Sequence, residues 1–199
     1  MKNFQIIKAL SSSSAVTGKA KDNSSMFIAG GTNLVDLMKK NIVAPDKLVD
    51  INGLDLKKIE FLKGKVAIGA LAKNSQVAED DSIKEKYPLL ALALAAGASQ
   101  QIRHMATVGG NMLQRTRCSY FYNIDMPCNK RTPKSGCGAI GGSNRMHAIF
   151  GASDSCIAVH PSDMCVALAA LDAKVLVEGP KGKREIDFTD FHRLPGNTP

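Results

Sequence analysis

The stretch from residue 115 to about residue 155 limits the possible folds of this chain more than any other feature of its sequence. It shows neither the 3.6-residue period of an amphipathic helix nor the alternation of a strand, and it holds three of the five cysteines. Structureless loops of this length are uncommon inside compact domains and are usually functional or disordered. The sequence therefore predicts a long ordered loop inserted into an otherwise compact fold.

The composition is that of an ordinary globular protein. Hydrophobic residues make up 44% of the 199 positions and charged residues 22%, which excludes a disordered or fibrous chain. A chain of this length buries enough apolar surface to fold without disulfides, and an odd number of cysteines argues against a disulfide framework. The net charge of +8 could serve to bind nucleic acid or to offset the charge of bound anions.

Strand and helix patterns lie on both sides of the loop. The periodicity predicts strands at residues 4–7, 26–29 and 47–51, hairpins at 59–71 and 174–186, and helices at 11–20, 34–40 and 77–96, the last broken at Pro88. Thr32 and Asn33 are predicted to cap the second of these helices, and Ser162 with Asp163 a further one after the loop.

Neither a membrane span nor a secretory signal is predicted. The longest apolar run, residues 89–96, has eight residues against the roughly 20 that a transmembrane helix needs. Gln5 and Lys8 interrupt the N-terminal segment, which therefore lacks the apolar core of a signal peptide. We expect a soluble, cytoplasmic protein without membrane insertion, and a periplasmic one if a partner subunit with a signal carries it across the membrane.

Two Gly-Gly pairs are the first candidate binding feature. Gly30-Gly31 separates a predicted strand from a helix in the segment AGGTN, and Gly109-Gly110 lies in TVGGN. A helix N-terminus offers unpaired N–H groups, and glycine lets a phosphate approach the backbone closely. Neither pair matches the G-x-G-x-x-G or P-loop pattern, and Gly-Gly is also common in plain turns. Anion binding and turn formation both remain open from the pattern.

The cysteines are the second candidate feature. They include no C-x-x-C pair of the kind that zinc modules use, whereas wide spacing suits a loop that wraps an iron–sulfur cluster. Cys165 falls inside the predicted helix after Ser162 and is interpreted as a buried small hydrophobic residue. That interpretation explains the three cysteines inside the loop poorly, because a glycine-rich polar loop has no core in which to bury them. Cys156 lies at the exit of the loop.

The histidines and the basic residues of the loop are less specific. His104, His147, His160 and His192 show no metal-ligand spacing, so structural or surface roles are predicted for them. The basic residues of the loop lie near Tyr120 and could form a nucleic-acid surface or a solvated face. They could equally offset the negative charge of cluster thiolates and of a pyrophosphate.

Three segments in this order resemble one known family. FIAGGTNLVDLMK, then ATVGGN about 75 residues later, then HPSDMCVALAALDA, are similar to the FAD-binding subunit of molybdenum hydroxylases, the xanthine dehydrogenase and aldehyde oxidoreductase family. The stretch GGNMLQRTRCSYFYNIDMPCNKR, continued through SGCGAI, is most similar to the flavin subunit of bacterial aldehyde oxidoreductases of the periplasmic type. Those subunits, and that of 4-hydroxybenzoyl-CoA reductase, hold a [4Fe-4S] cluster in such a loop.

The resemblance implies an α+β flavin fold of the vanillyl-alcohol-oxidase (PCMH) type with two α/β subdomains. Residues 1–53 would form the N-terminal FAD-binding subdomain, and residues 54–199 the second, with the iron–sulfur loop inserted at about 115–156. Family members continue into a further C-terminal domain, which is expected to be absent from this chain. Part of the wall around the flavin ring would then be missing.

The resemblance also implies binding residues, carried over position by position. The FAD-binding residues would be Ala29, Gly30, Gly31, Thr32, Asn33 and Leu34 at the pyrophosphate, Thr107, Gly110 and Asn111 in a second loop, and Asp163 toward the ribityl or ring end. The cluster ligands would be Cys118, Cys128, Cys137 and Cys156.

The function implied is electron transfer in an oxidoreductase. Substrate would be oxidised at a molybdenum cofactor on one partner subunit, and electrons would pass through a [2Fe-2S] partner to FAD in this chain, within a heterotrimer or its multimer. No residue of this chain would be catalytic toward the substrate, and nucleic acid would not be a partner. The alternatives are a zinc- or nucleic-acid-binding protein that uses the basic cysteine loop, and a self-contained flavin oxidase.

Overall fold

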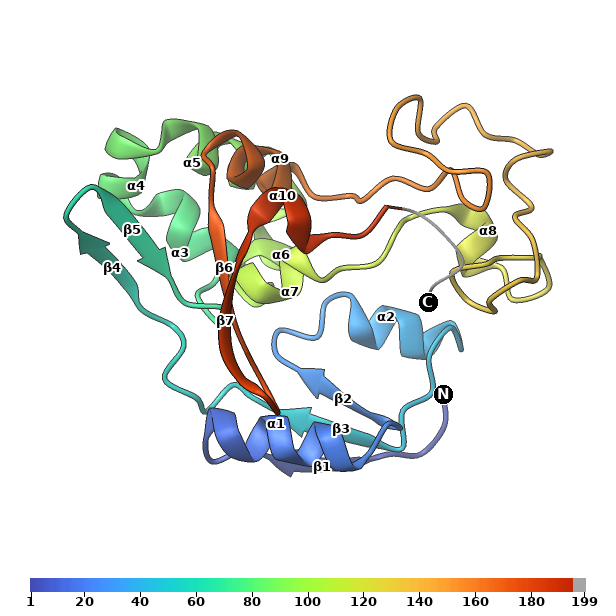
Figure 1. Cartoon of the computed structure of the whole chain (residues 1–199), viewed down its shortest axis with the longest axis horizontal. Helices are drawn as coiled ribbons and strands as arrows, with labels where there is room; N and C mark the ends of the chain where they lie inside the picture. Colours follow the sequence, from blue (N-terminus) through green and yellow to red (C-terminus); the bar gives the residue numbers. More distant parts are fainter. Residues whose placement is uncertain (195–199) are drawn as a thin grey trace.

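The computed structural model describes residues 1–194 and begins with a three-stranded parallel sheet in the order β1-β3-β2 (Figure 1). Its elements are β1 (Gln5–Lys8), α1 (Ser12–Lys21), β2 (Ser25–Ile28), α2 (Leu34–Lys39) and β3 (Lys47–Asp50). Successive residues of a strand point to opposite faces, and Leu48 and Val49 of the central strand are 1% and 2% exposed. The central strand is therefore covered on both faces, whereas the edge strand β1 is exposed along its length.

The second part of the chain is mostly helical and is framed by two antiparallel hairpins. Its elements are β4 (Ile59–Leu62), β5 (Lys65–Ile68), α3 (Asn74–Glu79), α4 (Asp81–Lys86), α5 (Pro88–Ala96), α6 (Gln100–Met105), α7 (Val108–Met112), α9 (Asp163–Ala170), β6 (Lys174–Gly179), β7 (Gly182–Asp187) and α10 (Phe188–Phe191). Val77, Ile83, Leu90 and Met164 lie in one apolar core and are at most 2% exposed. The hairpin β6–β7 reaches down to α1 and joins this part to the sheet (Figure 1).

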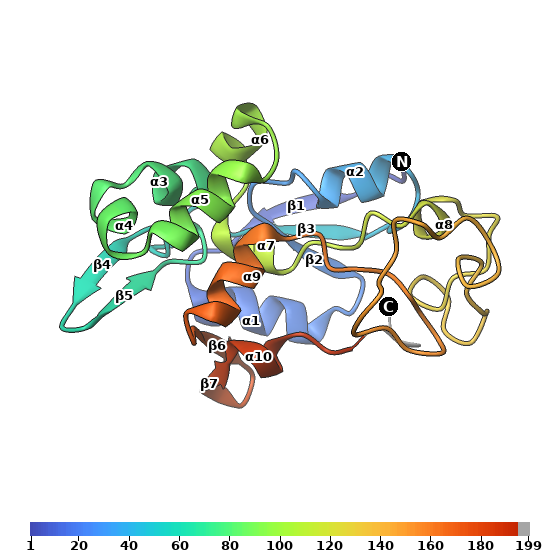
Figure 2. The same cartoon turned by 90° about the horizontal axis from the view of Figure 1, so that it is seen from above.

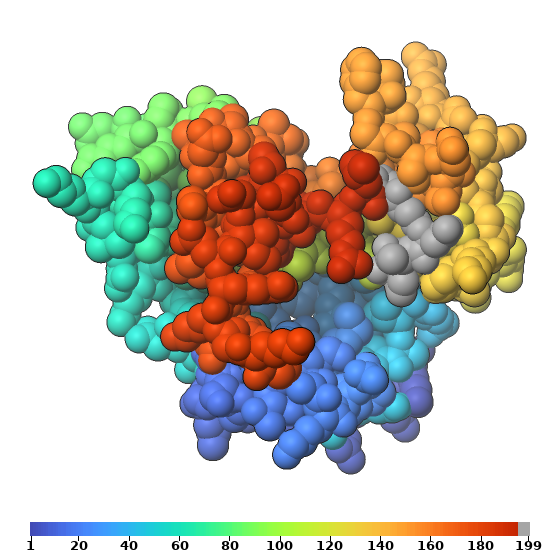
Figure 3. Space-filling model, viewed as in Figure 1, coloured from blue at the N-terminus to red at the C-terminus, as the bar shows by residue number. Residues whose placement is uncertain are grey.

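Between α7 and α9 the chain forms the long loop that the sequence predicts. We call residues 115–156 the cysteine loop; α8 (Ser119–Tyr122) is the one helix the structure describes within it. The loop lies at the end of the molecule opposite the β4–β5 hairpin (Figure 2) and stands out as a lobe of its own in Figure 3. Phe121 and Cys128, both buried, pack on Leu37 of α2. The loop is thus seated on the helix that follows the first glycine pair.

Two predicted elements differ from the structure. The helical stretch at 77–96 is broken at Asp80 as well as before Pro88, because the Asp80 carboxylate accepts a hydrogen bond from the Ile83 N–H (2.9 Å) and starts a new helix. The second glycine pair lies inside the short helix α7 and does not form a loop. No helix among the described residues is long and apolar enough to cross a membrane.

Candidate functional site

The first glycine segment, residues 30–34, presents unpaired backbone donors. Within the described part of the chain, the N–H groups of these five residues donate to no other residue. Gly31 has φ +74°, a left-handed conformation that strains any residue with a side chain. The segment therefore joins β2 to α2 by a turn whose amide groups are free to bind a ligand.

Gly30 forms the contact between the two parts of the chain. A Cβ atom at this position would lie 2.0 Å from the carbonyl oxygen of Met105 and 3.2 Å from the Cα atom of Ala106. Both atoms belong to the backbone just before α7, so only glycine fits here. The close approach brings the first glycine segment next to Thr107, the residue that begins the second glycine segment.

In the second glycine segment, most backbone N–H groups donate within the chain. Thr107 caps α7 by accepting a hydrogen bond from the Gly110 N–H (3.2 Å). The N–H groups of Val108 and Gly109 donate to the carbonyls of Ala72 and Ala70, at 2.9 and 2.8 Å. These two amides pack α7 on the chain before α3, and FAD binding by TVGGN stays a prediction.

Asn33 contributes a side chain to the first segment without capping the helix as predicted. It occupies the N-cap position of α2 but makes no side-chain capping bond there. Its Oδ1 atom accepts a hydrogen bond from the Arg115 N–H (2.9 Å), which fixes the orientation of the amide. Its Nδ2 atom is buried and has no partner among the described residues. A buried donor without a partner costs free energy, so this one is suited to a bound acceptor.

A small polar network links α7 to α9. The Oδ1 atom of Asn111 accepts hydrogen bonds from Ser162 Oγ (2.6 Å) and Gln114 Nε2 (2.8 Å). Ser162 alone caps α9, by accepting from the Cys165 N–H (3.1 Å); the predicted capping role of Asp163 is wrong. Asp163 is exposed in the first turn, with a carboxylate oxygen beside Gly97. The sequence pattern predicts Ser162 only as a helix cap, and the structure adds its hydrogen bond to Asn111.

The four loop cysteines converge although they are distant in the sequence. Cys128 and Cys137 face each other in an antiparallel bridge, and Cys156 closes a turn with Ser153. Cys118 stands at the N-cap of α8. The thiols of Cys118 and Cys156 each interact electrostatically with those of both Cys128 and Cys137, and all four are free.

Two of these thiols are partly buried and lie beside hydrogen-bonding groups. Burial, reinforced by the neighbouring thiols, raises the pKa of Cys118 and of Cys156. The His147 Nε2 atom lies 3.2 Å from Cys118 Sγ, and the Ala158 N–H donates to Cys156 Sγ at 3.5 Å. Hydrogen bonds to sulfur are one of the levers by which proteins tune iron–sulfur clusters.

Asn129 holds the cysteine-bearing segments together and could not be identified from the sequence. Its side chain, 6% exposed, donates to the Ser155 carbonyl (2.8 Å) and accepts from the Gly136 N–H (2.9 Å). These partners are the residues next to Cys156 and Cys137. One amide thus sets the spacing of three cysteine segments, because Asn129 itself follows Cys128.

Arg131 is the second residue that fixes the loop. Its guanidinium donates to carbonyl oxygens in and after α8, those of Tyr120, Phe121, Ile124 and Met126. We expect Arg131→Lys to raise the rate of proteolysis within the loop about 10- to 100-fold, because an ammonium group cannot bond all of these carbonyls and bonds to charged donors contribute about 1.5–3 kcal/mol each.

The matched control for that variant is Arg145→Lys, a replacement at an exposed arginine of the same loop. It should leave the rate of cleavage unchanged. Equal rates for Arg131→Lys and the parent protein would contradict the positioning role of Arg131.

With this geometry in place, comparison with known proteins identifies the family. A model of the FAD binding domain in molybdopterin dehydrogenase matches residues 2–199. The chain belongs to this family. It is 49% identical over 201 residues to the aldehyde oxidoreductase FAD-binding subunit PaoB of Escherichia coli K12, covering 100% of this chain and 63% of that protein. The resemblance noted in the sequence is confirmed.

More distant proteins are also similar to this chain. The glyceraldehyde dehydrogenase medium chain of Sulfolobus acidocaldarius is 26% identical over 98% of this chain and 54% of its own length. The crystal structure of a Cu,Mo-CO dehydrogenase matches with a TM-score of 0.69 at 23% identity, over 97% of this chain and 53% of that one. This likeness shows that the mixed α+β fold is shared. The chain spans between about half and two thirds of the length of these relatives.

Proposed function

We propose that this chain binds FAD with the pyrophosphate against residues 29–34. Two observations on one segment carry the proposal. Among the described residues, the backbone N–H groups of residues 30–34 have no acceptor, and the buried Nδ2 atom of Asn33 has no hydrogen-bond partner. Donors of this kind at a helix N-terminus suit a phosphate group, and α2 starts at this point. Membership of an FAD-binding family supplies the ligand that these donors would bind.

We further propose two subdomains of the PCMH type, residues 1–53 and 54–199, with the cofactor where they meet. In support, Gly30 of the first part contacts Met105 of the second, and Asn33 accepts a hydrogen bond from Arg115. Asn111 and Asp163 would line the remainder of the cofactor through α7 and α9. Thr107 and Gly110 would shape the wall at the start of α7, where the Gly110 N–H donates to Thr107 Oγ1.

The cysteine loop is proposed to hold a [4Fe-4S] cluster. Cys118, Cys128, Cys137 and Cys156 supply the four thiolates that such a cluster takes, from positions that need no fixed spacing in sequence. The nearby cations Arg115 and Lys130 interact with Cys128 and Cys156 and would offset the negative charge. The names of the relatives mention FAD and not iron, so this part rests on the loop itself.

Together these sites support a role as the electron-transfer subunit of a molybdenum-dependent oxidoreductase. PaoB is named as the FAD-binding subunit of an aldehyde oxidoreductase, and we infer an aldehyde- or xanthine-type activity for the complex of this chain. The partners would carry the molybdenum cofactor and [2Fe-2S] centres. Bound FAD supplies hydride and one-electron chemistry, and a cluster moves single electrons. This chain would bind and orient both groups, and the packing of Phe121 and Cys128 on Leu37 would keep them close.

The Asn33→Asp replacement tests the flavin site. It keeps the oxygen that accepts from the Arg115 N–H but turns the free donor into an anion that repels phosphate. Losing a donor to a charged group costs about 1.5–3 kcal/mol, so the Kd for FAD should rise at least about 10-fold. A titration followed by flavin fluorescence measures it.

Asn23→Asp is the matched control, because it makes the same change of charge at an exposed position of the same subdomain. Its affinity for FAD should equal that of the parent protein. An unchanged Kd for Asn33→Asp as well would place the pyrophosphate elsewhere.

A further inference from the structure

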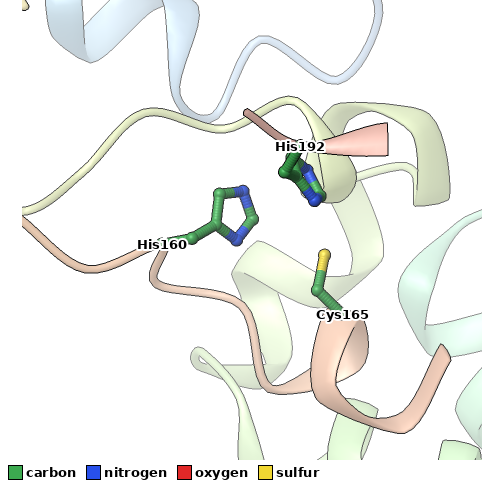
Figure 4. Close-up of side chains that lie close together, drawn as sticks. All are labelled: His160, Cys165 and His192. Atoms are coloured by element: carbon green, nitrogen blue, oxygen red, sulfur yellow. The ribbon is translucent and has the colours of Figure 1, made fainter. Parts of the chain in front are cut away.

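Cys165, the cysteine outside the loop, meets two histidines from other segments. The ligand atoms of His160, Cys165 and His192 all lie within 4.8 Å of one another. Cys165 lies in the first half of α9, His160 shortly before that helix, and His192 directly after α10, so the three reach the site from separate turns of the chain (Figure 4). None of the three is needed for the proposed FAD or cluster sites.

One backbone carbonyl sets the orientation of both imidazole rings. The Nε2 atoms of His160 and His192 lie 3.1 and 2.7 Å from the carbonyl oxygen of Met112, at the end of α7. A carbonyl only accepts hydrogen bonds, so both Nε2 atoms carry the proton and each Nδ1 atom keeps a lone pair. Metal-binding histidines almost always have such an outer partner for the second ring nitrogen. No local sequence pattern reveals this arrangement, because the two histidines are 32 positions apart.

We propose that His160, Cys165 and His192 bind a Zn²⁺ ion. Two imidazoles and one thiolate, with no carboxylate among them, are the donors that zinc prefers over calcium or magnesium. With Zn–N of about 2.0–2.1 Å and Zn–S of about 2.3 Å, tetrahedral ligand atoms lie about 3.5 Å apart. The three atoms are already within 4.8 Å of one another, so small side-chain rotations complete the site.

The fourth position opens on a cavity. Both histidines line a space of about 400 Å³ that also contains Arg115, Lys130 and Arg193. A zinc ion with three protein ligands takes water or an exogenous ligand at the fourth position. No acidic residue lines the cavity, so no carboxylate there can be the fourth ligand. Because three cationic side chains do line it, a water molecule or a small anion fits the fourth position.

Metal binding by the full-length chain tests the proposal, with Zn²⁺ and Co²⁺ as probes. After equilibrium dialysis against Zn²⁺, the parent protein should retain one equivalent more than Cys165→Ala or His160→Asn. Subtracting the zinc content of a variant from that of the parent removes the metal that the cysteine loop holds in both proteins. The Co²⁺ spectrum of the parent minus that of Cys165→Ala should show tetrahedral bands and a single thiolate-to-cobalt charge-transfer band.

His104→Asn is the matched control, since His104 is exposed on α6, and it should retain the full amount of metal. His160 is also exposed, so His160→Asn keeps the fold and decides the question even if Cys165→Ala unfolds. Zinc should also raise the Tm of the parent by several degrees relative to His160→Asn, because a ligand that binds the folded state stabilises it. Equal zinc content in the parent and His160→Asn would overturn the proposal.

Discussion

Gly30→Ala is expected to abolish FAD binding and to destabilise the fold. The added Cβ would lie 2.0 Å from the oxygen and 2.8 Å from the carbon of the Met105 carbonyl, and backbone cannot rotate away as a side chain can. Forced overpacking of this kind costs about 1–3 kcal/mol. Displacing the turn would also move its unpaired N–H groups out of line with the FAD pyrophosphate. Two lost bonds to a charged group correspond to at least about a 100-fold rise in the Kd for FAD.

Gly18→Ala is the control for this variant. Gly18 lies within α1, and a Cβ there would meet nothing within 4 Å. Alanine in a helix interior is favoured over glycine, so Gly18→Ala should bind FAD as the parent does and be about 0.5–1 kcal/mol more stable. Urea denaturation and flavin titration measure both quantities. Gly30→Ala with the FAD affinity of the parent would contradict the proposed pyrophosphate position.

Replacing any one of Cys118, Cys128, Cys137 and Cys156 by serine is expected to remove the cluster. Each supplies one of four thiolates, and the fifth cysteine, Cys165, lies on α9 outside the cysteine loop. Bound iron should fall from about four atoms per chain to near zero, while FAD binding by the first glycine segment is retained. Iron, acid-labile sulfide and the visible spectrum of anaerobically purified protein measure the outcome.

Cys165→Ser is the control, because Cys165 lies on α9 and outside the cysteine loop. It should keep the full amount of iron. Retained iron in a loop variant, or loss of iron in Cys165→Ser, would show that the ligands are assigned wrongly. Zinc in place of iron in the loop would favour the alternative of a zinc-binding protein.

Features set by neighbouring residues were predictable from the sequence. The turn at Gly30-Gly31 between β2 and α2 follows from an apolar run that ends at two glycines and continues with helical spacing. The hairpins and the long loop were also predictable, since the alternation of apolar and polar residues, or its absence, is visible within a few residues. The buried helical position of Cys165 also follows from local pattern, and the structure confirms it.

Features set by distant contacts were not predictable. The amides of Val108 and Gly109 are occupied by carbonyls of Ala72 and Ala70, and nothing in the segment TVGGN reveals those partners. The single amide of Asn129 joins three cysteine segments, which only the folded loop brings together. A polar residue in a loop looks the same in sequence whether it is solvated or holds the loop in place.

The central claim is that one chain holds FAD in its first glycine segment and a [4Fe-4S] cluster in its cysteine loop. The most direct test is anaerobic reconstitution of the full chain with FAD, iron and sulfide, followed by chemical analysis after desalting. We expect about one FAD and about four iron atoms per chain, with flavin and cluster absorption. A folded protein, by circular dichroism, that retains neither flavin nor iron would contradict it.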